Sequence, residues 1–280
     1  MQDLTRALRL ERPRRLAREL KLVRKAFRNW PAVAVTGVLW RHLALPQHDI
    51  VLESRNGARF VVPLDRKAGA LYPALDIFAF SAYEADWRLE DEPYVIDVGA
   101  HVGAFTLWLA ERYPGIRGAC YEPDAAAFSY LERNVSGLRI DAHQEAIAAY
   151  SGTAPLFRPA PGGGVSSLRA ESDSHAQSAV SVPVVSFDEL MEKTNTPVAL
   201  VKLDCEGSEY DIVLESNPES WRLVRRVVIE FHAVADAEPR ALVERLGSVG
   251  FSLVHGRRRF VGEGTYWFSR RSADGSVGDG

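Results

Sequence analysis

The sequence predicts an α/β fold built on a mostly parallel sheet, and three observations lead to this expectation. From residue 94 onward, short apolar runs alternate with segments of helical periodicity. The apolar runs are nearly continuous, which is typical of strands buried on both faces. The last two runs are joined by only a short connection, which favours an antiparallel pair at that end. Together these features predict parallel strands covered by helices on both faces.

The composition agrees with one large α/β domain carrying an N-terminal extension. The chain has 280 residues, of which 46% are hydrophobic and 25% charged, and these values suit a globular protein with a buried core. The net charge of -3 gives no reason to expect a nucleic-acid partner. Cys120 and Cys205 each lie in an apolar run. We therefore expect buried reduced thiols rather than a disulfide or a metal site.

Residues 1–28 are strongly basic, with ten Arg or Lys residues against three acids. Apolar residues recur there at roughly helical spacing, and Pro13 predicts two helical pieces rather than one. Two interpretations stay open: a helix packed on the main domain with a solvated basic face, or peripheral contact with an anionic membrane or an acidic partner. We expect a cytoplasmic protein without a signal peptide, because the first 28 residues lack an apolar core segment. The longest apolar run, residues 30–40, is also shorter than the ~20 residues that span a bilayer.

The elements are expected in the following order. Residues 49–64 predict a hairpin whose turn contains Asn56-Gly57, a dipeptide suited to a tight primed turn. Residues 65–90 are expected to form helices or loops that lead to the core. The predicted strands then span residues 94–98, 118–122, 139–144, 199–204, 226–231, 251–255 and 265–269, and the predicted helices span residues 104–113, 124–135, 208–216 and 237–246.

A Gly-, Pro- and Ser-rich stretch over residues 151–185 interrupts this alternation. It is too long for an ordinary loop, so we expect a functional loop or a small insertion. Within it, residues 158–170 predict a mobile lid. Gly162–Gly164 would permit the motion, and Ser166 and Ser167 would face the pocket.

The chain is divided accordingly into three parts. Residues 1–90 are the basic helical segment and hairpin extension, residues 91–271 the main domain, and residues 272–280 a disordered Gly- and Asp-rich tail. Ser186 and Glu189 form a capping box that begins a further helix after the insertion.

The segment VIDVGAHVGAFTLWLA carries the clearest sign of a ligand site. An apolar strand ends at Asp97, and Gly99 and Gly103 let the backbone turn sharply into a helix. His101 stands where a dinucleotide-binding fingerprint has its second glycine, which disfavours a pyrophosphate. Glu122 ends the next strand, where an acid can accept both hydroxyls of a ribose. The pattern favours S-adenosylmethionine (SAM), a nucleoside without phosphate, with Asp97 attracting the ammonium of its methionine portion.

Five segments, in order, resemble the FkbM family of methyltransferases: VIDVGAHVGAFTLWLA, CYEPDAAAFSYLERNV, VPVVSFDEL, VKLDCEGSEYDIVLES and VVIEFH. The resemblance covers about residues 92–234, and its most particular motif is KLDCEGSE, which begins at Lys202. The chain departs from the family at Cys205, where an apolar residue is more usual, and at His101, where Asn is more usual.

The resemblance implies a Rossmann-like class I methyltransferase fold: a mostly parallel seven-stranded sheet with an antiparallel last strand, preceded by an N-terminal helical and hairpin extension. It implies O-methylation of a sugar, glycan or natural product, with SAM as the methyl donor and S-adenosylhomocysteine as the product. The implied SAM contacts are Asp97, Gly99, His101, Gly103, Glu122 and Pro123 and, in the loop after the third strand, Gln144, Glu145 and Ala146.

The candidate catalytic residues follow from the chemistry of methyl transfer to oxygen, in which an alcohol must lose its proton. Ligands of this fold bind at the carboxyl ends of the strands. Lys202, Asp204 and Glu206 lie at the end of the fourth main strand, and Glu230 and His232 at the end of the fifth. We expect Asp204 or Glu206 to position the acceptor hydroxyl, with His232 as the base, because the ordinary pKa of histidine lies near neutrality. A pair of carboxylates could instead supply a base of raised pKa.

Several alternatives stay open. A divalent ion held by Asp204 and Glu230 is compatible with these acids, but their spacing does not require a metal. A nicotinamide-dependent oxidoreductase is disfavoured by His101 and by the lack of a Tyr-x-x-x-Lys pair. A non-catalytic binding protein on the same fold is the third possibility. The expected partner is a small-molecule or glycan acceptor; the sequence names neither this acceptor nor the oligomeric state.

Overall fold

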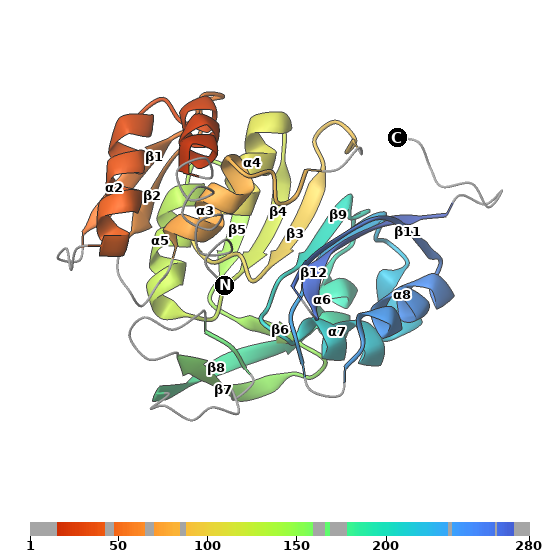
Figure 1. Cartoon of the computed structure of the whole chain (residues 1–280). Helices are drawn as coiled ribbons and strands as arrows, with labels where there is room; N and C mark the ends of the chain where they lie inside the picture. Colours follow the sequence, from red (N-terminus) through yellow and green to blue (C-terminus); the bar gives the residue numbers. More distant parts are fainter. Residues whose placement is uncertain are drawn as a thin grey trace, which may run out of the picture.

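The computed structural model describes residues 16–42, 48–64, 70–84, 88–158, 166–168, 178–234, 237–260 and 262–271. Its centre is a seven-stranded sheet in the order β11-β12-β10-β9-β3-β4-β5 (Figure 1). The parallel strands are β3 (Tyr94–Val98), β4 (Arg117–Tyr121), β5 (Arg139–His143), β9 (Leu200–Leu203) and β10 (Arg226–Phe231). Strand β12 (Glu263–Arg270) is antiparallel to both β10 and β11 (Phe251–Phe260). The predicted mostly parallel sheet with an antiparallel end is confirmed.

Helices cover both faces of this sheet (Figure 1). On one side lie α3 (Leu71–Phe78), α4 (Ala104–Arg112) and α5 (Ala125–Val135), and on the other α6 (Phe187–Lys193), α7 (Glu209–Glu215) and α8 (Pro239–Ser248). A short 3-10 helix, η1 (Pro218–Trp221), precedes β10. Successive side chains of a strand point to opposite faces. Val95 therefore joins the core beneath the first set of helices, and Ile96 the core beneath the second.

The register of the strands brings the predicted catalytic residues to one edge of the sheet. Asp97 and Lys202 are directly paired across β3 and β9. Asp204 follows the end of β9, Gly99 follows the end of β3, and Glu230 lies near the end of β10. The carboxyl ends of three adjacent strands thus meet where this topology places ligands.

The N-terminal elements pack on the face of the sheet that carries α3 to α5. A helix over residues 16–26 and α2 (Trp30–His42) precede a hairpin of β1 (Asp49–Glu53) and β2 (Arg59–Pro63). Phe27 and Leu52 are fully buried and belong to one apolar cluster with Trp267 of the main sheet. Residues on the two sides of the predicted division at residue 90 therefore share one core, and the division itself stays a prediction.

The basic segment over residues 1–28 is described only in its second half. Val23, on the helix over residues 16–26, is buried, whereas Arg24 and Lys25 are exposed. This arrangement matches a packed helix with a solvated basic face, and contact with a membrane stays a prediction. Within the ranges that the structure describes, every helix is too short or too polar to cross a bilayer.

The hairpin turn differs from the prediction. Ser54 N–H donates to Ala58 O at 2.8 Å, so the loop has three residues, Arg55 to Gly57. Gly57 has φ +120°, but Asn56 is not among the residues of positive φ, and a primed turn of type I′ needs positive φ at both central positions. The Ser54 hydroxyl accepts from the N–H groups of Gly57 and Ala58, at 3.1 Å each, and stabilises the wider loop.

Much of the stretch after β5 forms a second sheet rather than a loop. It comprises β6 (Ala146–Ala148), β7 (Gly152–Arg158) and β8 (Ser178–Ser186), in the order β6-β8-β7 (Figure 1). Leu156 and Val182 are among the side chains of its own small apolar core. Gly162–Gly164, the hinge of the predicted lid, lies outside the described residues, as does the predicted disordered tail over residues 272–280.

Candidate active site

The turn after β3 is built on left-handed backbone, with φ of 73° at Gly99, 53° at His101 and 84° at Gly103. Histidine is one of the few residues with a side chain that adopts this conformation with some frequency. A Cβ on Gly99 would lie 1.7 Å from Asp204 O, and a Cβ on Gly103 would lie 3.0 Å from Leu131 Cδ1. Gly99 therefore permits the close approach of β3 and β9, and Gly103 the packing of α4 on α5.

Replacing Gly99 by alanine should lower the free energy of unfolding by about 1–3 kcal/mol, because the new Cβ overlaps rigid backbone. Chemical denaturation measures this loss. The matched control is Gly57→Ala, since Gly57 also has positive φ but no atom within 4 Å of the new Cβ. Gly57→Ala therefore reports the cost of placing alanine in left-handed backbone alone, and the additional loss in Gly99→Ala reports the overlap of the new Cβ with Asp204 O. Equal losses in the two variants would contradict the role assigned to Gly99.

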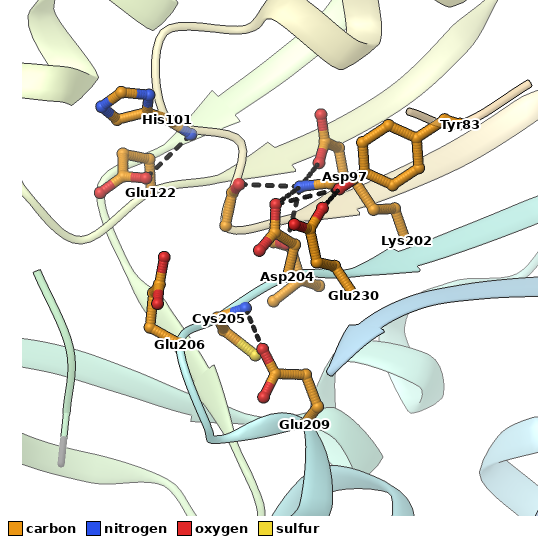
Figure 2. Close-up of polar contacts among 12 residues, drawn as sticks. Tyr83, Asp97, His101, Glu122, Lys202, Asp204, Cys205, Glu206, Glu209 and Glu230 are labelled. Atoms are coloured by element: carbon orange, nitrogen blue, oxygen red, sulfur yellow. Dashed lines mark hydrogen bonds and ion pairs between the residues drawn. The ribbon is translucent and has the colours of Figure 1, made fainter. Parts of the chain in front are cut away.

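Glu122 faces the same turn from the end of β4. His101 N–H donates to Glu122 Oε2 at 2.9 Å, and Asp124 N–H donates to Oε1 at 2.8 Å (Figure 2). Burial raises the pKa of Glu122 to about 7, although these two hydrogen bonds act in the opposite direction. Each carboxylate oxygen accepts one backbone bond and can accept another. This geometry fits two adjacent hydroxyls, such as those of a ribose.

Lys202 lies beneath the turn and neutralises two acids. Its Nζ is 3.1 Å from Asp97 Oδ1 and 3.2 Å from Asp204 Oδ2, and it donates to Gly99 O at 2.9 Å (Figure 2). Burial lowers the pKa of Lys202, but the charges of Asp204 and Asp97 outweigh it and raise that pKa overall. Asp97 also accepts from the hydroxyl of Thr106 at 2.8 Å. Protein groups therefore engage the carboxylate of Asp97, which is only 1% exposed.

The KLDCEGSE motif forms a tight turn around a buried acid. Glu209 is fully buried, and its two carboxylate oxygens accept from Cys205 N–H at 2.6 Å and Gly207 N–H at 2.7 Å. Glu206 has φ +54°, a conformation that costs energy for a residue with a side chain and often marks functional sites. Glu209 thus holds the turn, and Glu206 projects from it.

His232 is surrounded by three acids. Its Nδ1 lies 3.2 Å from Glu209 Oε1, and its Nε2 lies 3.4 Å from Glu206 Oε2 and 3.9 Å from Asp204 Oδ1. Burial lowers the pKa of His232, but the hydrogen bond and charge of Glu209 and the charges of Asp204 and Glu206 raise it to about 10. An imidazolium has no free lone pair, so this environment conflicts with the predicted role of His232 as the base.

Asp204 and Glu206 are neighbours with opposite pKa shifts. For Asp204, burial raises the pKa, but the charges of Lys202 and His232 outweigh it and hold the pKa below its usual range. For Glu206, burial dominates and raises the pKa to about 7, even though the charge of His232 opposes it. At neutral pH Asp204 is therefore a permanent anion, whereas Glu206 can take up or release a proton.

Tyr83 completes the site and was not predicted from the sequence. It follows α3 and is 2% exposed, and its hydroxyl lies 2.5 Å from Glu230 Oε2 and 3.1 Å from Asp204 Oδ2 (Figure 2). Burial and the charges of these two acids raise its pKa well above the usual value. No motif marks this tyrosine, because its position depends on how the segment after α3 crosses the strand ends.

A cavity connects the glycine-rich turn with the KLDCEGSE motif. Among the predicted site residues it is lined by Gly99, His101, Glu122, Pro123, Glu145, Ala146, Asp204 and Glu206. Asp97, Gly103, Gln144, Lys202 and His232 do not line it. Residues that were not predicted as SAM contacts also line the cavity. Ile147, Leu156, Ser166 and Leu168 form a mainly apolar wall on the side of the second sheet.

A metal is not needed to balance these acids. Ligand atoms of Asp204, Glu230 and His232 lie within 4.8 Å of one another. Lys202, however, is paired with Asp204, and the Tyr83 hydroxyl contacts both carboxylates. These groups of the chain already engage the two acids, and a divalent ion at this position stays a prediction.

The chain is similar in sequence to known methyltransferases. A model described as the methyltransferase FkbM domain matches residues 97–253, more than half of the chain. Methyltransferase 1 of Beauveria bassiana is 30% identical over 55% of this chain and 70% of its own length. Methyltransferase sdnD of Sordaria araneosa is 27% identical over 61% of this chain and 79% of its own length. The structure of M. jannaschii TYW2 in complex with AdoMet aligns over 81% of this chain and 89% of its own, with 13% identity and a TM-score of 0.38.

Proposed function

The chain belongs to the FkbM methyltransferase family and is a SAM-dependent methyltransferase, and on that basis we propose that it methylates a hydroxyl oxygen of a sugar, glycan or natural product. The observation that carries this proposal is the pair Asp204 and Glu206, whose pKa values are shifted apart beside the cavity. An alcohol reacts poorly until its proton is removed, whereas a neutral amine already has a free lone pair. A carboxylate that titrates near neutrality therefore favours oxygen as the acceptor atom.

Glu122 and Asp204 are the residues that would hold SAM. Glu122 presents two oxygens suited to the ribose hydroxyls, and Asp204 presents a permanent negative charge to the cationic end. SAM would supply an electrophilic methyl group bound to a sulfonium sulfur. The leaving group is a neutral thioether, so it needs no acid to protonate it. Asp97 does not line the cavity. It forms an ion pair with Lys202, and Lys202 in turn contacts Asp204 and donates to Gly99 O. Asp97 therefore acts on the site indirectly, by fixing Lys202.

Glu206 is the proposed base. It takes the proton of the acceptor hydroxyl on its carboxylate, and the His232 imidazolium at 3.4 Å stabilises the charged form of that carboxylate before the proton arrives. Asp204, being a weaker base, stays ionised and keeps its role toward the cofactor. Two acids with separated pKa values thus serve two functions within one cavity.

The segment of residues 166–168 is expected to move when SAM enters. The cavity has a volume of about 100 Å³, whereas small-molecule sites usually have about 300–1,000 Å³. Ser166 Oγ donates to Asp124 Oδ2 at 3.1 Å, and Ser167 Oγ donates to Glu206 O at 2.8 Å. These bonds tie the wall to both sides of the cavity. They support the expectation that this segment opens for SAM and closes over it.

A second cavity, of about 670 Å³, could receive the body of the acceptor. It lies between the helix over residues 16–26, α3 and β11, and its lining includes both apolar side chains and Arg257. Arg257 is paired with Thr265 on β12, and Thr265 is paired with Glu230 on β10. Directly paired residues share a face of the sheet, so Arg257 lies two strands, about 10 Å, from Glu230. This mixed lining suits a natural product with apolar and polar parts.

The function is tested with matched acceptors that carry a hydroxyl, an amine or a methyl ether on the same skeleton. Sugars, lipid-linked glycans, polyketides and RNA are each incubated with SAM that carries a labelled methyl group. Transfer to the hydroxyl form alone is the expected result. Transfer to the amine form alone, or to RNA bases, would contradict the proposal. SAM binding without turnover on any acceptor would favour the non-catalytic alternative.

Replacing Glu122 by alanine should weaken SAM binding about ten-fold or more, because a charge-assisted hydrogen bond contributes roughly 1.5–3 kcal/mol. Titration calorimetry measures the affinity. Glu122→Gln keeps the shape of the side chain and should have a smaller effect. Glu132, an exposed glutamate on α5, provides the control: Glu132→Ala should bind SAM like the unaltered protein. Unchanged affinity in Glu122→Ala would refute this assignment.

A further inference from the structure

Tyr83 reaches the catalytic edge of the sheet from outside the part of the chain that matches the family. It precedes β3, whereas the family match begins at residue 97. Its ring packs edge-on against Phe105 of α4, with 4.8 Å between the ring centroids, and is 2% exposed. The N-terminal part of the chain thus places a buried hydroxyl at the centre of the site.

This hydroxyl lies between two carboxylates from neighbouring strands. It is 2.5 Å from Glu230 Oε2 and 3.1 Å from Asp204 Oδ2, and Figure 2 shows the ring of Tyr83 pointing at both acids. A phenol has one proton to donate. One donor therefore serves both carboxylates, and without it Asp204 and Glu230 would face each other with no hydrogen bond to offset their mutual repulsion.

The contacts of Tyr83 and Lys202 also fix the orientation of the Asp204 carboxylate. Asp204 Oδ2 contacts both Tyr83 Oη and Lys202 Nζ, at 3.1 and 3.2 Å. Its other oxygen, Oδ1, is on the side of His232, whose Nε2 lies 3.9 Å away. Because Asp204 lines the SAM cavity, fixing Oδ2 on the protein side leaves Oδ1 for a ligand.

We propose that Tyr83 is a positioning residue that holds Asp204 beside Glu230, so that Asp204 Oδ1 faces the positive charge of SAM. This inference rests on the proposed role of Asp204 toward the cofactor. It also assigns to the N-terminal part of the chain a direct share in cofactor binding, beyond packing against the core.

The test compares the SAM affinity of Tyr83→Phe with that of the unaltered protein at pH 7.5, by titration calorimetry. The control is Tyr210→Phe, because Tyr210 is also 2% exposed and its hydroxyl has no partner among the described residues. We expect Tyr83→Phe to bind SAM about ten-fold more weakly than the unaltered protein. Tyr210→Phe should bind SAM like the unaltered protein.

A second variant separates positioning from packing. In Tyr83→Phe/Glu230→Gln, the amide at position 230 can donate to Asp204 in place of the lost hydroxyl, so SAM affinity should recover. Equal affinities of Tyr83→Phe and the unaltered protein would overturn the proposal. So would a deficit that the amide does not rescue. Failure of methyl transfer to hydroxyl acceptors would instead contradict the proposed function and would leave this binding measurement interpretable.

Discussion

Replacing Glu206 by glutamine should lower kcat about 10²- to 10⁴-fold, because the variant lacks the group that removes the acceptor proton. SAM affinity should stay unchanged, since Glu122 and Asp204 are intact. Single-turnover kinetics at saturating SAM measure the chemical step directly. The matched control is Glu215→Gln, since Glu215 is an exposed glutamate at the end of α7. It should keep the full rate.

The pH profile provides a second criterion for the same variant. A base works only when it is ionised, and burial raises the pKa of Glu206 to about 7. In the unaltered protein kcat should therefore be low at acidic pH, rise as the pH passes through about 7, and reach a plateau above it. Glu206→Gln should lose this rise. A variant with the normal rate and the normal profile would place the base elsewhere, with Asp204 as the next candidate.

Replacing Lys202 by methionine should lower the free energy of unfolding by about 3–5 kcal/mol at neutral pH. The substitution preserves most of the volume but leaves Asp97, which is 1% exposed, and Asp204 without their shared cation. Urea denaturation at pH 7.5 and pH 5 measures the effect. At the lower pH the unpaired carboxylates take up protons more easily, so the deficit should shrink.

Two further variants determine whether unpaired buried charge causes the loss of stability in Lys202→Met. Lys202→Met combined with Asp97→Asn removes one of the stranded anions and should recover part of the stability. Lys193→Met breaks an exposed ion pair, in which Nζ lies 2.7 Å from Glu189 Oε1, and should leave the stability unchanged because exposed pairs contribute little. If the two single lysine variants lost the same stability, the argument from burial would fail.

The central sheet could be predicted from the sequence because its strands are buried on both faces. The predicted strands over residues 94–98 and 226–231 coincide with β3 and β10. Strand β11 extends to Phe260, beyond the predicted end at residue 255. Beyond residue 255 the strand carries the exposed residues Gly256, Arg257 and Arg258, because an edge strand needs no continuous apolar run. The strands β7 and β8 of the second sheet were likewise not predicted, because Gly, Pro and Ser residues interrupt their apolar pattern.

The site was predictable where it follows strand ends and unpredictable where it depends on tertiary packing. Glu122, Asp204 and Glu206 were expected beside a ligand because strand ends converge there in this topology, and all three line the cavity. The charge of His232 could not be predicted, since it depends on acids that the turn around Glu209 brings together in space. Tyr83 lacks any sequence signal for the same reason.

The order of the strands also has a consequence for how the chain folds. Strand β3 lies between β4, its near neighbour in sequence, and β9, and Lys202 follows Gly99 by 103 residues. Strands β3 to β5 can pair through local crossovers, whereas pairing β3 with β9 closes a long loop and is slower. Until β9 docks, Asp97 has no cation in the interior. The late half of the chain therefore brings the counter-charge that the early half needs, and the two halves of the sheet are expected to fold in one cooperative transition.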